Sequence, residues 1–261
     1  IHKLITIVKR SMQNKFNINT INLLKSMHFS GLEPMFETPN YEIAFALLSI
    51  GVYFAIITES NTAVFITVLA GYIEAQMLAL SEELNNLWED ANVYLHLFKE
   101  LRGVDKTNKN NKILNVYIRN RLRDIVTKHR TIINLLGKVE NIFRGAIAME
   151  FGCATSALIA ELLGGLESTF MQLPYTLLQV AMNCFIGQRL IDASLVLENS
   201  VYSCNWENFD TPNRKTVFLM LLNSQKTLRL SAGGLTILSF TSLMSILKSI
   251  YSVYTALRSR M

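Results

Sequence analysis

The sequence predicts an all-α fold, a polytopic bundle of membrane helices, and three observations support this prediction. Half of the residues are hydrophobic and only 17% are charged, whereas a soluble domain carries about 25% charged residues. No lysine or arginine occurs between Lys25 and Lys99, or between Arg144 and Arg189. A cation at the centre of a bilayer costs roughly 2.5–3.5 kcal/mol, so a bilayer explains both cation-free stretches.

The first predicted span lies in the first of these stretches. Residues 43–58 carry no charge, and after Glu59 residues 60–73 are again uncharged. About 20 apolar residues cross a bilayer, and continuation of the pattern through Leu87 predicts a helix that runs past the membrane. Glu59 is costly inside a span, so we expect it to face a cavity or the bundle interior, or to lie near one surface. We expect the polar stretch 88–112 to be a solvated loop.

Three further helical segments follow. Apolar residues spaced by three, four or seven positions from Ile118 onward predict an amphipathic helix, which we expect to continue through residues 145–163. Glu150 and Glu161 in that run are expected either at an interface or beside a cavity. Residues 168–188 carry no charge and predict a second clear span. Residues 230–257, interrupted only by Lys248, predict a last span, which a second amphipathic segment at residues 215–228 precedes.

The distribution of basic residues also predicts the orientation. Segment 99–144 is strongly basic and should be cytoplasmic, whereas the loop near 164–173 has no lysine or arginine and should be extracellular. The basic segment 196–229 then returns to the cytoplasm, so the last span leaves the C-terminus extracellular. A heptahelical G-protein-coupled receptor ends inside the cell, and the topology therefore argues against that class.

Other function classes receive no support from motifs. The sequence has no Walker lysine loop, no G-x-G-x-x-G and no G-x-S-x-G, so we expect no enzyme activity and no cofactor. Cys153, Cys184 and Cys204 form no C-x-x-C pair and are expected to be buried apolar residues, with no metal site. No stacking aromatics are interleaved with the basic segment, which argues against nucleic acid as a partner.

The C-terminal part carries the most specific pattern. It contains Tyr202-x-x-x-Trp206, then Arg214-Lys215, Ser224-Gln225-Lys226, Ala232-Gly233 and Tyr251-Ser252. In order and spacing these motifs resemble the C-terminal signature of the insect odorant receptor family. The resemblance extends upstream to Cys184-Phe185-Ile186-Gly187, to His129 and to Pro39-Asn40-Tyr41-Glu42, and so covers about residues 39–261. Leu243, where the family usually has phenylalanine, and Thr227, where a proline often follows, depart from the pattern.

The resemblance implies a receptor of seven helices, of which about four spans are visible here. It implies a cation channel in the plasma membrane, opened by a small volatile odorant and assembled with a shared co-receptor as a hetero-tetramer. The co-receptor of the family has a long insertion where this chain has the short connection 88–113, so the chain looks like an odorant-tuning subunit. Because the chain begins with Ile1, we expect it to be a fragment of a longer receptor.

The same resemblance divides the chain into four parts. We expect residues 1–40 to be part of an N-terminal, extracellular loop region. Residues 41–193 would hold transmembrane helices, with a basic cytoplasmic connection at 88–144. Residues 194–229 would form cytoplasmic anchor helices where subunits meet, and residues 230–261 would form a last helix that lines the pore.

Three sets of site residues follow. An odorant pocket is expected between the extracellular halves of helices 43–60 and 174–190, although helix packing alone would explain the same apolar residues: Leu48, Val52, Tyr53, Tyr175 and Met182. The pore set combines a lone cation with an outer apolar gate: Lys248, Tyr254, Ala256 and Leu257. The subunit interface set pairs two residues expected on one helical face with a later aromatic, and intrachain packing is its alternative: Tyr202, Trp206 and Phe218.

Two other readings remain open at this point. A gustatory-type chemosensory channel shares the architecture of the last helix, but its usual final T-Y-x-x-x-x-Q-F is absent. A membrane transporter would be supported by inverted internal repeats, and none is visible in the sequence.

Overall fold

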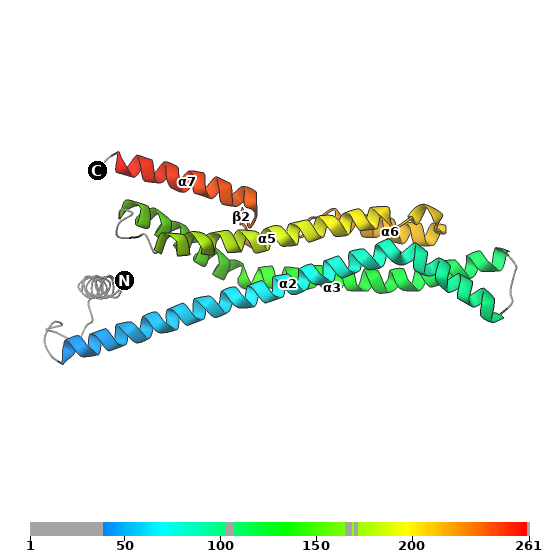
Figure 1. Cartoon of the computed structure of the whole chain (residues 1–261), viewed down its shortest axis with the longest axis horizontal. Helices are drawn as coiled ribbons and strands as arrows, with labels where there is room; N and C mark the ends of the chain where they lie inside the picture. The colour runs from blue at the N-terminus through cyan, green and yellow to red at the C-terminus, as the bar shows by residue number, and fades with distance from the viewer. Residues whose placement is uncertain (1–38, 103–106, 165–168, 170–171, 260–261) are drawn as a thin grey trace, which may run out of the picture. The chain divides into compact units, whose positions relative to one another are not determined.

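A computed structural model of the chain describes residues 39–102, 107–164, 169 and 172–259. Helices dominate these residues, as the sequence predicts (Figure 1). The chain forms two compact units, one ending at Ala63 and one beginning at Val64, and each is described by itself. Of the predicted extracellular loop region 1–40, residues 1–38 lie outside the described part.

Helix α2 runs from Asn40 to Arg102, so the predicted loop at residues 88–112 is wrong. Residues 88–102 mix charged side chains with exposed apolar ones such as Val93 and Leu97, whereas Leu87 and Ala91 are fully buried and Leu95 packs on the same core. These positions are four residues apart, which is helical spacing, and no glycine or proline interrupts the stretch before Gly103. The connection between the first two long helices is therefore much shorter than composition indicates.

Helix α3 runs from Thr107 to Leu163 and confirms the predicted continuation of the amphipathic segment into the apolar run. Its buried stripe recurs at three- and four-residue intervals, which places these side chains on one face. Lys128 Nζ reaches Glu83 Oε1 at 2.6 Å and fastens α3 to the part of α2 that follows Val64. The stripe comprises Leu114, Ile118, Leu122, Ile125, His129, Ile132, Leu136 and Val139.

Helix α5 runs from Gln172 to Ser203, and a short helical turn, η1, occupies Trp206–Asn208. Asn205 separates them with φ of 56°, a left-handed conformation that asparagine tolerates. Tyr202 and Trp206 therefore do not share a continuous helix, and the prediction that they do is wrong. Their connection is a hydrogen bond instead, because Trp206 Nε1 donates to the Tyr202 carbonyl at 3.0 Å.

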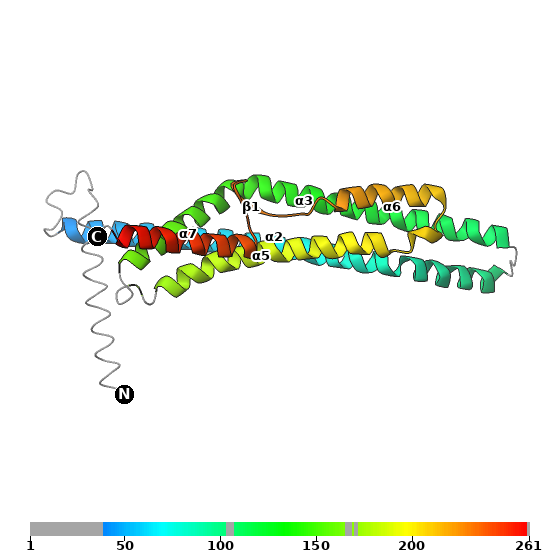
Figure 2. The same ribbon diagram turned by 90° about the horizontal axis from the view of Figure 1, so that it is seen from above.

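Helix α6, Thr211–Ser224, lies alongside α3 (Figure 2). Its start is fixed locally: Asp210 is the N-cap and accepts a hydrogen bond from Asn213 N at 3.1 Å, and Pro212 stands in the first turn, where proline lacks only an N–H that the helix does not use. The side chain of Asn115 on α3 accepts from Asp210 N at 3.1 Å. The cap and the packing of α6 are therefore set by the same few residues.

A small hairpin joins α6 to the last helix. Strand β1, Ser231–Ala232, pairs antiparallel with β2, Thr236–Ile237, and Gly233 and Gly234 turn between them with φ of 67° and 76°. Helix α7 begins only at Phe240 and ends at Arg258, with Ser239 as its N-cap. The predicted last helix from residue 230 is therefore wrong at its start, because two glycines at positive φ end any helix there.

Three helices among the described residues are long and apolar enough to cross a membrane, Ser60–Leu101, Asn110–Leu163 and Gln172–Asn208, and Glu42–Gly51 is a shorter apolar helix. Helix α7 is not among the three, because its hydroxyl side chains and Lys248 lower its mean hydropathy. Much of each apolar window is exposed within the chain: only 28% of it is buried in the first two helices and 39% in the third. Apolar side chains that neighbouring helices do not cover are what a bilayer accommodates.

Candidate functional site: a hydroxyl-lined helix, a clamped hairpin and a cavity

Helix α7 has chemically different faces. Leu243, Ile246 and Ile250 pack on the core that α3 and α5 contribute. On the opposite side the hydroxyl side chains of Thr241, Ser245, Ser249 and Ser252 are all exposed, at spacings of four, four and three residues. Lys248 is exposed and, because it follows Thr241 by seven residues, lies beside this hydroxyl stripe. The arrangement suits a helix that presents its polar side to water or to another helix.

The three predicted gate residues do not all lie on the face that carries the hydroxyl stripe. Ala256 follows Ser252 by four residues and continues the hydroxyl stripe, whereas Leu257 follows Ile250 by seven and so continues the core-facing side. Leu257 is 39% exposed because it lies beyond the packed part of the helix. Tyr254 accepts a hydrogen bond from Arg258, whose guanidinium also lies 5.8 Å from the tyrosine ring centroid. The pore assignment of these residues stays a prediction, and Arg258 is a cation that it did not include.

Three of the five candidate odorant contacts, Tyr53, Tyr175 and Met182, are exposed apolar side chains, and Leu48 is half-buried. On α5, Tyr175 and Met182 are 65% and 45% exposed and, being seven residues apart, share one face, to which Leu178 and Phe185 also belong. Leu48 and Tyr53 belong to the unit that ends at Ala63, as does Val52, whose side chain lies outside the described part. A pocket between the two groups therefore remains a prediction.

Two of the three predicted membrane carboxylates have partners across the α3–α5 pair. Glu161 is 5% exposed and accepts from Thr176 Oγ1 at 2.8 Å, while its other carboxylate oxygen has no partner. Glu150 accepts from Asn183 Nδ2 at 2.9 Å and from Gln179 at 3.5 Å. These bonds partly satisfy acids that would be costly in an apolar segment. Their donors are polar residues of α5, which the sequence analysis did not single out. The side chain of Glu59, the third, lies outside the described part.

The hairpin before α7 is clamped from both sides. Ser231 Oγ donates to Glu140 Oε1 at 2.6 Å, and Gly233 N donates to the Arg144 carbonyl at 3.2 Å, so α3 holds β1 and the turn. On the other side Leu238 crosses Gly187 of α5 so closely that a Cβ there would lie 2.2 Å from the Leu238 carbonyl oxygen. The sequence did not predict this contact, although Gly187 ends the Cys184-Phe185-Ile186-Gly187 motif that resembles the family pattern.

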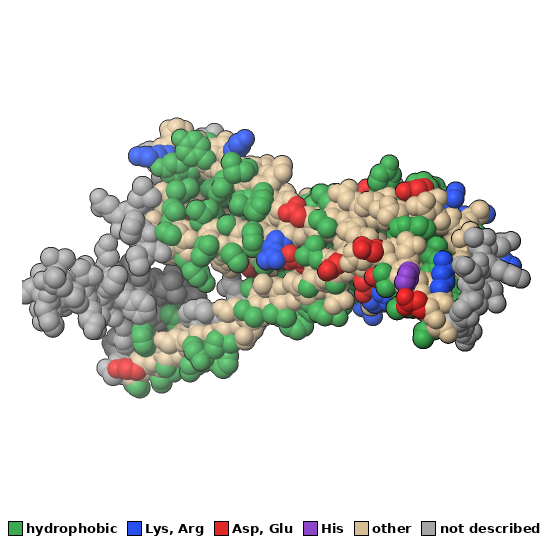
Figure 3. All heavy atoms as spheres, turned by 45° about the vertical axis from the view of Figure 1, so that its right-hand side comes forward, with side chains coloured by type: hydrophobic (Ala, Val, Ile, Leu, Met, Phe, Trp, Pro, Cys, Tyr) green, Lys and Arg blue, Asp and Glu red, His purple; other side chains and the backbone are tan. Residues whose placement is uncertain are grey.

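The predicted interface residues are accessible. Tyr202 is 67%, Trp206 37% and Phe218 59% exposed, and Leu219 and Leu222 continue an exposed apolar surface on α6. In Figure 3 charged side chains gather at one end of the unit that begins at Val64, whereas hydrophobic side chains cover the surface around α7. The exposed aromatic residues are available to a partner surface but also occur singly on many proteins.

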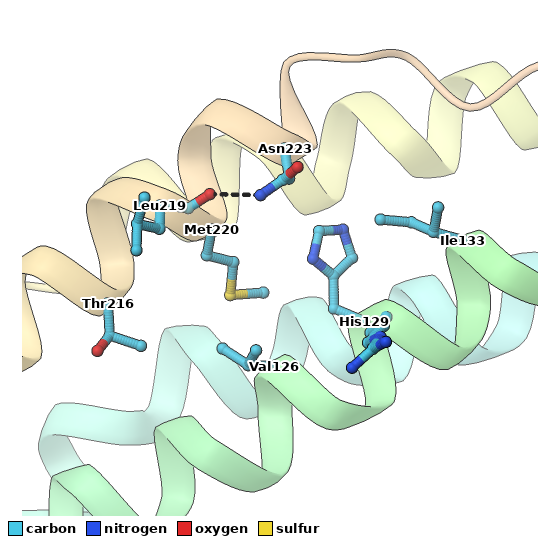
Figure 4. Close-up of a pocket in the computed structure, with 8 residues that line it drawn as sticks. Val126, His129, Ile133, Thr216, Leu219, Met220 and Asn223 are labelled. Carbon is cyan, nitrogen blue, oxygen red and sulfur yellow. Dashed lines mark hydrogen bonds between the residues drawn. The ribbon is translucent and has the colours of Figure 1, made fainter.

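A cavity of about 420 Å³ opens between α3 and α6. His129, Arg130, Thr216 and Asn223 supply its polar lining, and the rest is apolar. Figure 4 shows the His129 imidazole directed from α3 toward Asn223 and Met220 on α6. His129 lies on the buried stripe of α3, and the sequence gave no sign of a cavity beside it.

Comparison with known proteins decides the family. The family model described as 7tm Odorant receptor matches residues 24–251. The chain belongs to this odorant receptor family. The gustatory-type and transporter readings are therefore set aside.

Individual relatives agree with this family assignment. Odorant receptor 22c of Drosophila melanogaster is 26% identical over 171 residues, which cover 62% of this chain and 42% of that protein. Odorant receptor 13a of the same species is 28% identical over 161 residues, covering 53% and 38%. The chain thus spans less than half the length of these curated relatives.

A solved structure supports the fold of the odorant receptor chain. The insect olfactory receptor OR5 from Machilis hrabei, determined in complex with eugenol, superimposes with a TM-score of 0.70 at 15% identity. The match covers 87% of this chain and 55% of that one. It confirms the predicted all-α helical bundle, and together with the family match it supports a multi-pass membrane protein.

Proposed function

We propose that this odorant receptor chain is part of a cation channel subunit that a small volatile organic molecule opens, and that it works in the plasma membrane with a shared co-receptor. One observation carries the channel proposal: the exposed hydroxyl stripe of α7, opposite the face that packs on α3 and α5. A helix bounded by lipid alone has no use for a row of hydroxyls, whereas a wetted pore wall does. Four such helices around one axis, one from each subunit, would form the pore of a hetero-tetramer.

The ligand class rests on apolar surface and on a relative. Pockets for small organic molecules are mostly apolar, with few polar groups, and the exposed face of α5 with Tyr175 and Met182 has this character. The olfactory receptor OR5 was solved with eugenol, a small volatile phenol. Ligand binding would open the channel by the difference between its affinities for the open and closed states.

The proposed division of the chain now follows the observed elements. Residues 41–193 hold the membrane helices, and the cytoplasmic ends of α2 and α3 project as two long helices joined by a short connection. The segment 194–229 is the cytoplasmic anchor, and its exposed Tyr202, Trp206 and Phe218 meet neighbouring subunits. Residues 230–239 are a linker hairpin, and the pore helix proper is α7, Phe240–Arg258.

Recordings from cells that express a full-length receptor containing this sequence test the function. With the co-receptor present, a panel of volatile phenols, esters and alcohols should evoke inward cation current, and cells with the co-receptor alone should stay silent. If the receptor reaches the surface and no volatile evokes current, the channel proposal is wrong.

The proposed topology has its own test. An epitope tag after the last residue should bind an impermeant label on intact cells, because the C-terminus is proposed to be extracellular. Labelling only after permeabilisation would contradict this orientation.

A further inference from the structure

The cavity between α3 and α6 contains an imidazole with no described partner. His129 is 5% exposed, its ring points into the cavity (Figure 4), and none of the described residues donates to it or accepts from it. Neither imidazole nitrogen is among the described side-chain atoms that are fully buried without a partner, so the ring nitrogens border the open space of the cavity. An imidazole held in this position is therefore a group that a ligand could satisfy.

The rest of the lining fixes the chemistry of such a ligand. Arg130 is the one charged side chain among the lining residues, and no described carboxylate forms an ion pair with it. Asn223 Nδ2 donates a hydrogen bond to the Leu219 carbonyl at 2.8 Å. Arg130 is exposed, so water solvates its guanidinium in the empty cavity. A guanidinium beside an imidazole favours an anion, and one cation matches a head group of one negative charge, which guanidinium binds through two parallel hydrogen bonds.

The remaining wall is apolar. Ile133 of α3 and Leu219 and Met220 of α6 face the same space, and the volume of about 420 Å³ is in the range of small-molecule sites. Methionine adapts its shape to different apolar partners. A head group at Arg130 and His129 would leave room for a short hydrocarbon body against these three side chains.

We propose that this cavity binds a small organic carboxylate, its head group on Arg130 and His129 and its hydrocarbon body against Ile133, Leu219 and Met220. The site lies between the proposed cytoplasmic part of α3 and α6, separate from the proposed odorant contacts. Because α6 leads through the clamped hairpin to α7, an occupant that holds α6 against α3 acts on the helix proposed to line the pore.

Photolabelling of the purified receptor tests the site without any measurement of current, so the proposal and the channel function can fail separately. The probe is a diazirine-bearing analogue of octanoate, and mass spectrometry locates the cross-linked residues. Labelling is expected within residues 126–133 or 216–223. Free octanoate should compete, whereas acetate, which lacks the hydrocarbon body, and the matching octanol should compete poorly.

Variants then test the head-group contacts. Arg130→Gln should weaken labelling about tenfold, the size expected for losing a charged hydrogen bond, and Arg130→Lys should retain part of it. His129→Phe should also weaken it, and Leu219→Trp should block the cavity from its exposed side. Arg123→Gln is the matched control, because Arg123 is an exposed cation on the same helix outside the lining. Equal labelling of Arg130→Gln and Arg123→Gln, equal competition by octanol, or labelling elsewhere only would overturn the proposal.

Discussion

Gly187 of α5 and Leu238 of the hairpin are in such close contact that no side chain fits between them. A Cβ at position 187 would lie 2.2 Å from the Leu238 carbonyl oxygen and 2.5 Å from the Leu238 Cβ. Both atoms belong to a short segment that α3 also holds through Glu140 and the Arg144 carbonyl. The hairpin that leads to α7 is thus fixed against two long helices by a glycine and a few hydrogen bonds.

Gly187→Ala should therefore destabilise the receptor. The added methyl overlaps a backbone carbonyl, which cannot rotate away as a flexible side chain can, and overpacking of this kind costs about 1–3 kcal/mol. Thermal unfolding of the purified receptor should show a lower midpoint. Gly137→Ala on α3 is the control, since nothing lies within 4 Å of a Cβ there, and alanine in a helix is about 0.5–1 kcal/mol better than glycine. Equal midpoints for the two variants would contradict the close contact.

Thr176 and Glu161 should be energetically coupled. Thr176→Val leaves a buried carboxylate oxygen without its only described hydroxyl donor, which costs about 1–3 kcal/mol, whereas replacing both partners by apolar groups is nearly neutral. Chemical unfolding should therefore show that Glu161→Leu with Thr176→Val is more stable than Thr176→Val alone. Thr131→Val controls for the loss of a threonine, because Thr131 bonds only to the Thr127 carbonyl of its own helix. Additive effects would mean that the 2.8 Å hydrogen bond contributes nothing.

The sequence predicts the long helices well and their ends poorly, for physical reasons. The spacing of Ile118, Leu122 and Ile125 reports the buried face of α3 directly, since burial repeats with the helix. The charged residues within 88–102 report only that part of that surface meets water, whereas Leu87 and Ala91 lie on the buried side of the same helix. The sequence contains Gly233 and Gly234, but their positive φ depends on pairing between β1 and β2 and could not be predicted from the glycines alone.

The candidate sites show the same division. Periodicity finds the apolar face of α5 and the hydroxyls of α7, because each lies along one helix. It does not find the His129 cavity or the Gly187 contact, because these depend on how α6 and the hairpin lie against α3 and α5. Tyr202 and Trp206 were paired by helical spacing, and the left-handed Asn205 between them ends that helix one turn early.

Trp206→Ala should weaken assembly with the co-receptor. The indole is 37% exposed next to Tyr202 and is proposed to meet a neighbouring subunit. Aromatic residues at interfaces often contribute about 2 kcal/mol or more to the binding free energy, which is roughly thirtyfold in affinity. Co-purification from detergent extracts measures the effect. Leu235→Ala is the control, because Leu235 is 93% exposed in the hairpin turn outside the anchor segment. Undiminished co-purification of Trp206→Ala would favour packing within the chain instead.

Met182→Trp and Val52→Trp should alter the odorant spectrum while surface expression holds. Met182 belongs to the exposed apolar face of α5, and a tryptophan there would occupy space that a ligand needs. Dose–response curves for a panel of volatiles measure the change. Met149→Trp is the matched control, because Met149 is 71% exposed on α3 and is not a proposed ligand contact. An unchanged response profile for both pocket variants would remove this pocket.

Cysteine scanning of α7 should separate its faces, and this is the sharpest test of the pore. Cysteines at Ser245, Ser249 and Ser252 should react with impermeant thiol reagents in the open state, because these positions form the hydroxyl stripe. Cysteines at Leu243 and Ile246 should not react, since both pack on the core.

Leu257→Ala should raise ligand-free current if Leu257 is the gate. Ala256 continues the hydroxyl stripe, whereas Leu257 continues the core-facing side. If the stripe faces the pore along its whole length, Ala256→Val should therefore reduce current more than Leu257→Val. Lys248→Gln should leave cation selectivity nearly intact. A ring of cations in the axis of a cation pore would repel the ions that pass, so the amine of Lys248 is expected to point away from the axis.

The cysteine scan decides between the faces of α7. If the reagents modify the core-facing cysteines as fast as the cysteines of the hydroxyl stripe, α7 does not line the pore through its hydroxyl face.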